Sequence, residues 1–260
     1  MQIIKSFLIA VSMYSVIPVR RFAWKEEDMK YVFCFFPWVG ALIGGCIYFW
    51  SWLCRIYQIG GLCRAAIAVA IPVFLTGGFH ADGFMDTMDA IHSYRSRERK
   101  LEILKDSHIG AFAAILLAVY GLVFLGAFSE VKEEALLKIV CAGFFLSRCL
   151  CGLSAVSFPL AKKDGMLSAV AGCSHKKIVK GALGLQGMAC IGLMCFWSRF
   201  AGLVSAAAAL LALACYFYRS RKEFGGITGD TSGYFILLCE VCITAAAAFI
   251  NIFMERGLGT

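Results

Sequence analysis

Long apolar segments recur along this chain of 260 residues, and they limit its fold more strongly than any other feature of the sequence. A helix that crosses a membrane needs about 20 predominantly apolar residues. Segments of roughly this kind lie at 3–19, 31–54, 62–79, 109–128, 135–159, 182–198, 200–218 and 233–253. We therefore predict an all-α, polytopic membrane protein with about seven or eight transmembrane or re-entrant helices.

The composition supports a single integral membrane domain over residues 1–260. Only 16% of the residues are charged, whereas a soluble domain is closer to about a quarter charged. The first segment, 3–19, is short, carries Lys5 and ends at Pro18, so an interfacial or re-entrant helix is the alternative to a span there. It lacks a small-residue cleavage site, so we do not expect a cleavable signal peptide.

Thirteen cysteines lie mostly within the apolar segments, where cysteine behaves as a small hydrophobic residue. Cys239 and Cys242 have the C-x-x-C spacing, but they lie in the middle of a segment and no second pair accompanies them. We therefore expect a reduced chain and no metal or redox role for this pair.

The distribution of basic residues predicts the orientation of the chain. The loops at 20–30, 80–108, 160–180 and 219–232 hold four, five, five and three of the 25 Lys and Arg residues, whereas the opposite face holds seven. Lys and Arg are concentrated in cytoplasmic loops, so these four loops are predicted to be cytoplasmic, with short elbow helices among them. Orientation thus explains the formal charge of +8, and no nucleic-acid partner is expected.

An aspartate cluster stands out in "GGFHADGFMDTMDA", residues 77–90. On a helix, the spacing of Asp82, Asp86 and Asp89 places the three carboxylates within roughly 60° of one another. Like charges on one stripe repel, and Mg²⁺ is a suitable counter-ion because it binds carboxylates and bridges them to substrate phosphates. The alternative is a solvated helix start whose acids pair with the nearby Arg95, Arg97, Arg99 and Lys100.

Other polar residues extend this cluster. Asp106 and Asp230 would add carboxylates from the predicted cytoplasmic loops. The pattern G-G-x-x-x-D occurs at Gly77-Gly78…Asp82 and again at Gly225-Gly226…Asp230, so the two loops either face each other across one site or match by chance. Glycines near the cluster let the backbone approach a phosphate closely, or they serve a turn or helix packing.

Histidine and lysine side chains offer further chemistry. His80 is predicted to transfer a proton or contact a phosphate. For His92 and His108, an ordinary position at the membrane interface is at least as good an explanation as a functional role. No H-x-x-x-H spacing supports zinc. Residues 93–110 are predicted to form an amphipathic helix, with its apolar side chains on the membrane and its Arg and Lys side chains towards water. Lys105 and Arg95 are candidates for binding anionic groups of the substrate.

Two charged residues lie within apolar segments. Ionisable side chains inside a membrane are costly and indicate function by default. Glu240 is an acid in the last segment, and Arg148 is its natural partner by charge.

These residues predict transfer chemistry on a phosphate or pyrophosphate at the cytoplasmic face, where metal and cations neutralise the developing charge. These residues do not identify the substrate, but the chain also resembles a known family, the cobalamin synthase (adenosylcobinamide-GDP ribazoletransferase) family. That family has a pattern close to GG-x-H-x-D-G-x-x-D-T-x-D, then L-E-I-M-K-D-S-R-I-G, then G-G-x-T-G-D before a glutamate-bearing apolar helix. The matching positions here are Gly77, Gly78, His80, Asp82, Gly83, Asp86, Thr87 and Asp89, then Leu101 to Gly110, then Gly225 to Asp230 with Glu240. Three positions depart from it: Ala90, Leu104 and His108, the last of which puts an anion-binding role at position 108 in doubt.

The resemblance implies the last assembly step of the cobalamin lower ligand in a bacterial inner or plasma membrane. A hydroxyl of α-ribazole or its 5′-phosphate would attack adenosylcobinamide-GDP and release GMP, with Mg²⁺ as cofactor. Partners would be the two substrates, the lipid bilayer and either a second copy or other cobalamin-assembly enzymes. We assign catalysis to His80, Asp82, Lys105 and Asp106, metal binding to Asp82, Asp86, Asp89 and Asp230, and substrate binding to Gly77, Gly78, Gly83, Thr87, Arg95, Arg148, Gly226, Thr228 and Glu240. His80 or one of the aspartates would take the hydroxyl proton.

Two alternatives remain from the sequence. A CDP-alcohol phosphotransferase has the pattern D-G-x-x-A-R, but Asp82-Gly83 is followed by Asp86-Thr87, so the A-R is missing. A secondary transporter would use Glu240 and Arg148 for substrate or protons. The preferred base, the form of the acceptor and the oligomeric state are not evident from the sequence.

Overall fold

The computed structural model describes residues 2–19, 24–106, 108–162 and 164–255. Arg20, Arg21, Lys163 and Arg256, which enter the count of basic residues, and Ser107, within the block 101–110, lie outside the described residues. The described chain is helical. Its elements are α1 (Gln2–Tyr14), η1 (Glu26–Met29), α2 (Val32–Ile56), α3 (Gly61–Thr76), α4 (Phe79–His92), α5 (Arg97–Ile103), α6 (Ala111–Ser129), α7 (Glu134–Ser157), α8 (Met166–Cys173), α9 (Lys176–Trp197), α10 (Arg199–Phe224) and α11 (Gly229–Glu255).

The predicted polytopic helical fold is confirmed. Among the residues that the structure describes, six helices are long and apolar enough to cross a membrane: α2, α6, α7, α9, α10 and α11. The pair α3 and α4 forms a seventh candidate, bent by 95° where the two helices meet. The first predicted segment corresponds to α1, whose 13 residues span only about 20 Å of a hydrocarbon core that is roughly 30 Å thick. It is therefore too short to cross alone.

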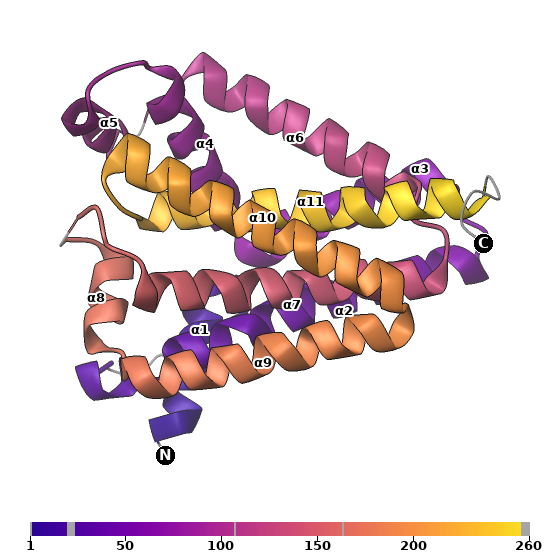
Figure 1. Cartoon of the computed structure of the whole chain (residues 1–260), viewed down its shortest axis with the longest axis horizontal. Helices are drawn as coiled ribbons and strands as arrows, with labels where there is room; N and C mark the ends of the chain where they lie inside the picture. Colours follow the sequence, from indigo (N-terminus) through magenta and orange to yellow (C-terminus); the bar gives the residue numbers. More distant parts are fainter. Residues whose placement is uncertain (1, 20–23, 107, 163, 256–260) are drawn as a thin grey trace.

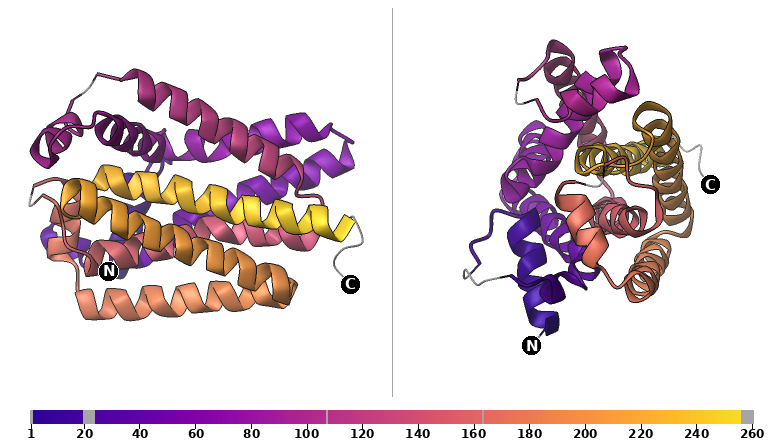
Figure 2. Two further views of the ribbon diagram at one scale, coloured as in Figure 1. Left: turned by 45° about the horizontal axis from the view of Figure 1, so that its top comes forward. Right: turned by 90° about the vertical axis from the view of Figure 1, so that its left-hand side faces the viewer.

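Helix α7 lies at the centre of the bundle (Figures 1 and 2), where it packs against α2, α9, α10 and α11. Within its apolar window, 83% of the residues are buried inside the protein. Gly40 and Gly44 of α2 face the backbone of α7 so closely that a Cβ atom at either position would overlap it. Small residues spaced four apart let helices approach in this way, because a membrane supplies little hydrophobic force between them.

The connections next to the aspartate cluster lie together at one end of the bundle. The α4–α5 connection, α8 and the turn between α10 and α11 all lie at the left in Figure 1, whereas the turns after α2, α6 and α9 lie at the opposite end. The prediction that these loops share one face therefore agrees with the fold. The tight turn predicted at Ser198-Arg199 is also confirmed, because Ser198 ends α9 and caps α10.

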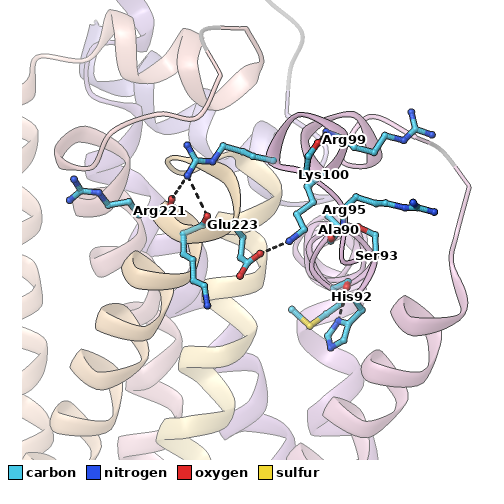
Figure 3. A network of polar contacts seen from close by, with 12 residues as sticks. Ala90, His92, Ser93, Arg95, Arg99, Lys100, Arg221 and Glu223 are labelled. Atoms are coloured by element: carbon cyan, nitrogen blue, oxygen red, sulfur yellow. Dashed lines mark hydrogen bonds and ion pairs between the residues drawn. The ribbon is translucent and has the colours of Figure 1, made fainter.

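The prediction for residues 93–110 is wrong in two respects. Only Arg97–Ile103 is helical, and Leu104 packs on Ala90 and Phe224 instead of facing the membrane. Lys100 does not face water: it is buried and forms an ion pair with Glu223 at the end of α10, as Figure 3 shows. Arg97 also donates to the carbonyls of Arg221 and Lys222. These contacts fasten α5 to the protein, which explains why its apolar side is not available to lipid.

Candidate active site

The aspartate stripe is confirmed as one helix, because Asp82, Asp86 and Asp89 all lie on α4. The bend before this helix is formed by Gly77 and Gly78, whose φ angles are +64° and +79°. These values belong to the left-handed region that favours glycine, so the two residues let α3 turn into α4. The backbone amide of Asp82 then donates to the Gly78 carbonyl at 2.8 Å, which starts the new helix with Asp82 in its first turn.

Helix α11 brings Asp230 to the same place. A Cβ atom at Gly83 would lie 2.8 Å from the carbonyl oxygen of Asp230, so only glycine allows α4 and α11 to approach this closely. The two G-G-x-x-x-D loops therefore face each other across one site, as the first of the two alternatives predicted. Thr228 caps α11 by accepting from the Thr231 amide at 3.1 Å, and its hydroxyl donates to Asp230 at 3.3 Å.

Negative charge accumulates around Asp86. This half-buried carboxylate interacts with the charges of Asp82, Asp230 and Asp89, and Lys162 opposes them. In the described part of the chain, no group of three or more His, Cys, Asp or Glu side chains is close enough to hold a metal ion by itself. Mg²⁺ does not need such a group, because it is usually bound by one or two carboxylates together with waters and substrate phosphates, and Asp82, Asp86 and Asp230 are oxygen donors of this kind.

Asp89 has a different environment from the other aspartates. Its two carboxylate oxygens accept from the backbone amides of Gly110 at 2.6 Å and Ala113 at 2.8 Å. These amides belong to the start of α6, which has no capping side chain of its own. Asp89 therefore caps α6 from another helix, and its predicted role as a metal ligand would require it to give up these bonds.

Lys162 is the residue that the sequence prediction missed. The segment before it pairs with the loop before α11, because Ile227 donates to the Pro159 carbonyl and Ala161 donates to the Ile227 carbonyl, each at 2.9 Å. Gly226 permits this pairing, since a Cβ atom there would lie 2.5 Å from the Pro159 oxygen. The pairing brings the half-buried Lys162 near Asp230 and Asp86. Burial lowers the pKa of its ammonium group, although Asp230 acts in the opposite direction.

Lys162 lines a cavity of about 240 Å³ together with Lys105, Asp164, Thr228 and Asp230. Lys105 forms an exposed ion pair with Asp164 at 3.2 Å. The cavity therefore combines two lysines with the start of α11, a combination suited to an anionic group. The adjacent lysines of the "AKKDG" loop, Lys162 and Lys163, were the only signal for it in the sequence.

Several predicted residues lie away from this centre. Asp106 accepts from both the amide and the ring of His108 instead of joining the cluster, and these bonds lower its pKa. Thr87 is completely buried, and its hydroxyl lacks a partner within the described chain. Arg95 is exposed and points away from the Lys100–Glu223 pair (Figure 3).

The alternative in which the acids pair with nearby basic residues is not supported. Arg97 binds backbone carbonyls, Arg99 pairs with Glu102, and Lys100 pairs with Glu223. Among the described contacts, none joins these side chains to the aspartates of α4. These basic residues therefore do not compensate the stripe, and a bound cation remains a natural compensation.

Arg148 and Glu240 meet deep in the bundle, as their charges predicted. The Arg148 Nη1 atom lies 2.5 Å from the Glu240 Oε1 atom, and both side chains are almost completely buried. Ser147 donates to the same carboxylate oxygen at 3.4 Å. Such a pair is stable in a low-dielectric interior only when both charges stay together.

Fold and site together define a polytopic membrane protein whose carboxylates and lysines converge at one end, the arrangement expected of an enzyme that transfers a phosphorus-containing group. The chain belongs to the cobalamin-5-phosphate synthase family, because the model of that family matches residues 6–248.

Relatives named adenosylcobinamide-GDP ribazoletransferase cover nearly the whole chain. The protein from Lachnoclostridium phytofermentans is 39% identical over 260 residues, which is 100% of this chain and 99% of the relative. The protein from Geobacillus thermodenitrificans is 32% identical, with 90% of this chain and 92% of the relative covered. The protein from Treponema denticola is 31% identical, with 95% and 99% covered. No solved structure matches the chain. The family assignment confirms the resemblance seen in the motifs and decides against the CDP-alcohol phosphotransferase and the transporter.

Proposed function

We propose that this transferase joins adenosylcobinamide-GDP to α-ribazole or α-ribazole 5′-phosphate, giving adenosylcobalamin or its 5′-phosphate and GMP. The observation that carries the proposal is the convergence of Asp82, Asp86, Asp230 and Lys162 at one end of a bundle. A pyrophosphate needs such a site, because charge moves onto its oxygens as the phosphorus–oxygen bond breaks. The names of the relatives supply the substrate class.

In the proposed reaction, a ribazole hydroxyl oxygen attacks the phosphorus next to the cobinamide aminopropanol. The bond from this phosphorus to the bridging oxygen breaks, and GMP leaves with the electron pair. Asp82, Asp86 and Asp230 would hold Mg²⁺, which when bound neutralises charge on the pyrophosphate. Lys162 and Lys105 contact phosphate oxygens from the cavity beside Asp230. Thr228 orients Asp230 through its hydroxyl.

The hydroxyl proton passes to an aspartate in this proposal. His80 is the other candidate, but only 4% of its surface is exposed, and it lies beside Arg148 and Glu240 in the interior. A general base must come within hydrogen-bonding distance of the proton that it takes. The carboxylates of α4 lie nearer the open end of the site, so an aspartate is the better acceptor.

We further propose that the site faces the cytoplasm from a bacterial plasma membrane, since most basic residues lie in the loops at that end. Association with a second copy or with other enzymes of cobalamin assembly stays a prediction, and size-exclusion chromatography with light scattering would measure it.

The experiment that tests the function uses purified protein in liposomes. It receives adenosylcobinamide-GDP and α-ribazole with Mg²⁺ or with EDTA, and GMP is measured alongside the corrinoid product. We expect Mg²⁺-dependent release of both, and a loss of at least a hundredfold in Asp82→Asn because a ligand charge is removed. Glu130→Gln, at the opposite end of the bundle, is the matched control and should keep full activity. Equal turnover of Asp82→Asn and wild type would contradict the assignment.

A further inference from the structure

A mainly apolar cavity of about 180 Å³ lies next to the aspartate site, where α3, α4, α6, α7 and α11 meet. His80 and Ala81 line it from α4, Tyr120 and Gly121 from α6, and Glu240 from α11. For comparison, an apolar protein cavity of roughly 150 Å³ holds one benzene ring. The space therefore suits a compact, flat ring system.

Two side chains of this cavity, His80 and Arg148, each have a buried nitrogen atom without a hydrogen-bond partner in the described chain. His80 is 4% exposed, and its Nε2 atom is unpartnered within the described chain. A buried polar atom without a partner destabilises the protein, so such an atom in a cavity wall indicates a ligand that supplies the missing bond. A neutral imidazole nitrogen can donate to, or accept from, a single heteroatom of an aromatic ring.

The remaining polar groups of the cavity also suit an aromatic guest. Tyr120 offers an aromatic face, and the Arg148 guanidinium, held by Glu240, offers a planar cation that stacks on rings. Both charges of the Arg148–Glu240 pair are satisfied by each other. The pair adds no net charge to the cavity, and the Nε2 atom of His80 and the Nε atom of Arg148 are left without partners in the described chain. This favours an uncharged heteroaromatic ring that can accept a hydrogen bond over a phosphate or a lipid chain.

The cavity adjoins the open part of the site. A cleft of about 570 Å³ is lined by Gly77, Gly78 and Asp82, and it shares Thr76 and Ala81 with the cavity. A molecule whose polar end lies at Asp82 can thus place an apolar ring beside His80. A riboside has this shape, because its ribose separates the base from ring hydroxyls that stay free even in a 5′-phosphate.

We propose that this cavity binds the heteroaromatic base of the acceptor riboside, with the His80 Nε2 atom hydrogen-bonded to the free ring nitrogen of the base. The proposal rests on the proposed function and extends it, since it assigns the acceptor to the interior and the pyrophosphate to the aspartates. The size of the cavity then selects among bases: a compact two-ring base fits, and bulky ring substituents do not.

The first test fills the cavity without touching the aspartates. A side chain added at Gly121 meets open space, and so does one at Gly126 on the same helix, but only Gly121 lines the cavity. We expect Gly121→Leu to raise the KM for α-ribazole at least tenfold while the KM for adenosylcobinamide-GDP stays unchanged. Gly126→Leu should leave both constants unchanged. Equal acceptor KM values in the two variants would overturn the proposal.

The second test does not depend on turnover, so it separates this proposal from the proposed function. Benzimidazole and its carbocyclic analogue indene are added to detergent-purified wild type, and binding is followed by saturation-transfer NMR. We expect both to bind and to be excluded by Gly121→Leu. His80→Phe should weaken benzimidazole about tenfold relative to indene, because only the nitrogen contact is lost. Two outcomes would contradict the proposal even if GMP release is observed. One is that benzimidazole does not bind to wild type, as expected if lipid fills the cavity. The other is that His80→Phe keeps the wild-type preference for benzimidazole over indene.

Discussion

The aspartates that share one sequence pattern have different surroundings in the structure. Asp82 and Asp86 lie with Asp230 where negative charge accumulates and Lys162 opposes it in part, whereas Asp89 is bonded to the start of α6. Asp106 pairs with its neighbour His108. Residue type and helical spacing indicate which carboxylates could meet, but the partners of each oxygen decide its role. Lys162 is the cation that the carboxylates face.

Lys162 provides the pH-dependence prediction. Burial lowers the pKa of its ammonium group, so it loses its charge at a lower pH than a free lysine does, and a rate that needs this charge falls as the pH rises through that pKa. Arginine stays charged at all accessible pH values. We therefore expect Lys162→Arg to move the alkaline limb of the kcat/KM profile to higher pH. Lys162→Ala should lower kcat/KM roughly ten- to a hundredfold at neutral pH.

The matched control for this measurement is Lys180→Arg, on the exposed side of α9. It should leave the profile unchanged. An alkaline limb that stays in place in Lys162→Arg would show that another group sets it.

At the level of elements, three helix starts build the site. Helix α4 begins after the Gly77-Gly78 bend, α11 begins at the Thr228 cap, and α6 begins at amides that Asp89 binds. Each start leaves amides without partners inside the helix. Thr228 binds one of these amides at α11, and Asp89 binds two at α6. The aspartate helix is thus connected to α6 by hydrogen bonds and to α11 by close packing.

The cap on α6 predicts opposite effects of two similar substitutions in metal-free protein. Asp89→Asn replaces one accepting oxygen with an amide, so α6 loses one of its two bonds, and stability should fall by about 1–2 kcal/mol. Asp82→Asn removes a like charge near Asp86 and should leave stability unchanged or raise it. Thermal unfolding in detergent with EDTA measures both. A loss of stability that appears in Asp89→Asn only when Mg²⁺ is added would favour the ligand role instead.

The whole molecule is a bundle of membrane-length helices around α7, with the site at one end (Figure 2). The loops at that end include α5 and α8, and α5 is fastened to α10 by Arg97 and Lys100. The opposite end carries the start of α3, where Cys63 is exposed. The two ends therefore offer accessible positions on opposite sides of the membrane.

Orientation can be measured at these positions. Tyr94 is 83% exposed at the site end. In a Cys63→Ser background, we expect Tyr94→Cys to react with a membrane-impermeant maleimide in inside-out vesicles but not in intact spheroplasts, because basic loops stay in the cytoplasm. Cys63 in the otherwise native chain should react in intact spheroplasts but not in inside-out vesicles. Labelling of Tyr94→Cys from outside would place the site on the other face.

Much of this architecture could be predicted from the sequence. Apolar length located the six helices that are long enough to cross, since a lipid core requires helices of a given length. The segments 3–19 and 62–79 correspond to α1 and α3, which are shorter. The helical period placed three aspartates on one stripe, and charge anticipated the Arg148–Glu240 pair. The segment 93–110 was misjudged because its apolar side chains fit a membrane surface and a protein surface equally well.

By itself, the sequence determined that the chain is a membrane bundle with a carboxylate stripe and a basic face, because these properties depend only on local spacing and composition. Tertiary structure decided that Asp89 caps α6, that Lys162 reaches Asp230, and that His80 faces a cavity. These arrangements join residues far apart in the chain through close backbone approaches at Gly83 and Gly226. Local preference carries no information on such distant contacts, so only the packed helices could specify them.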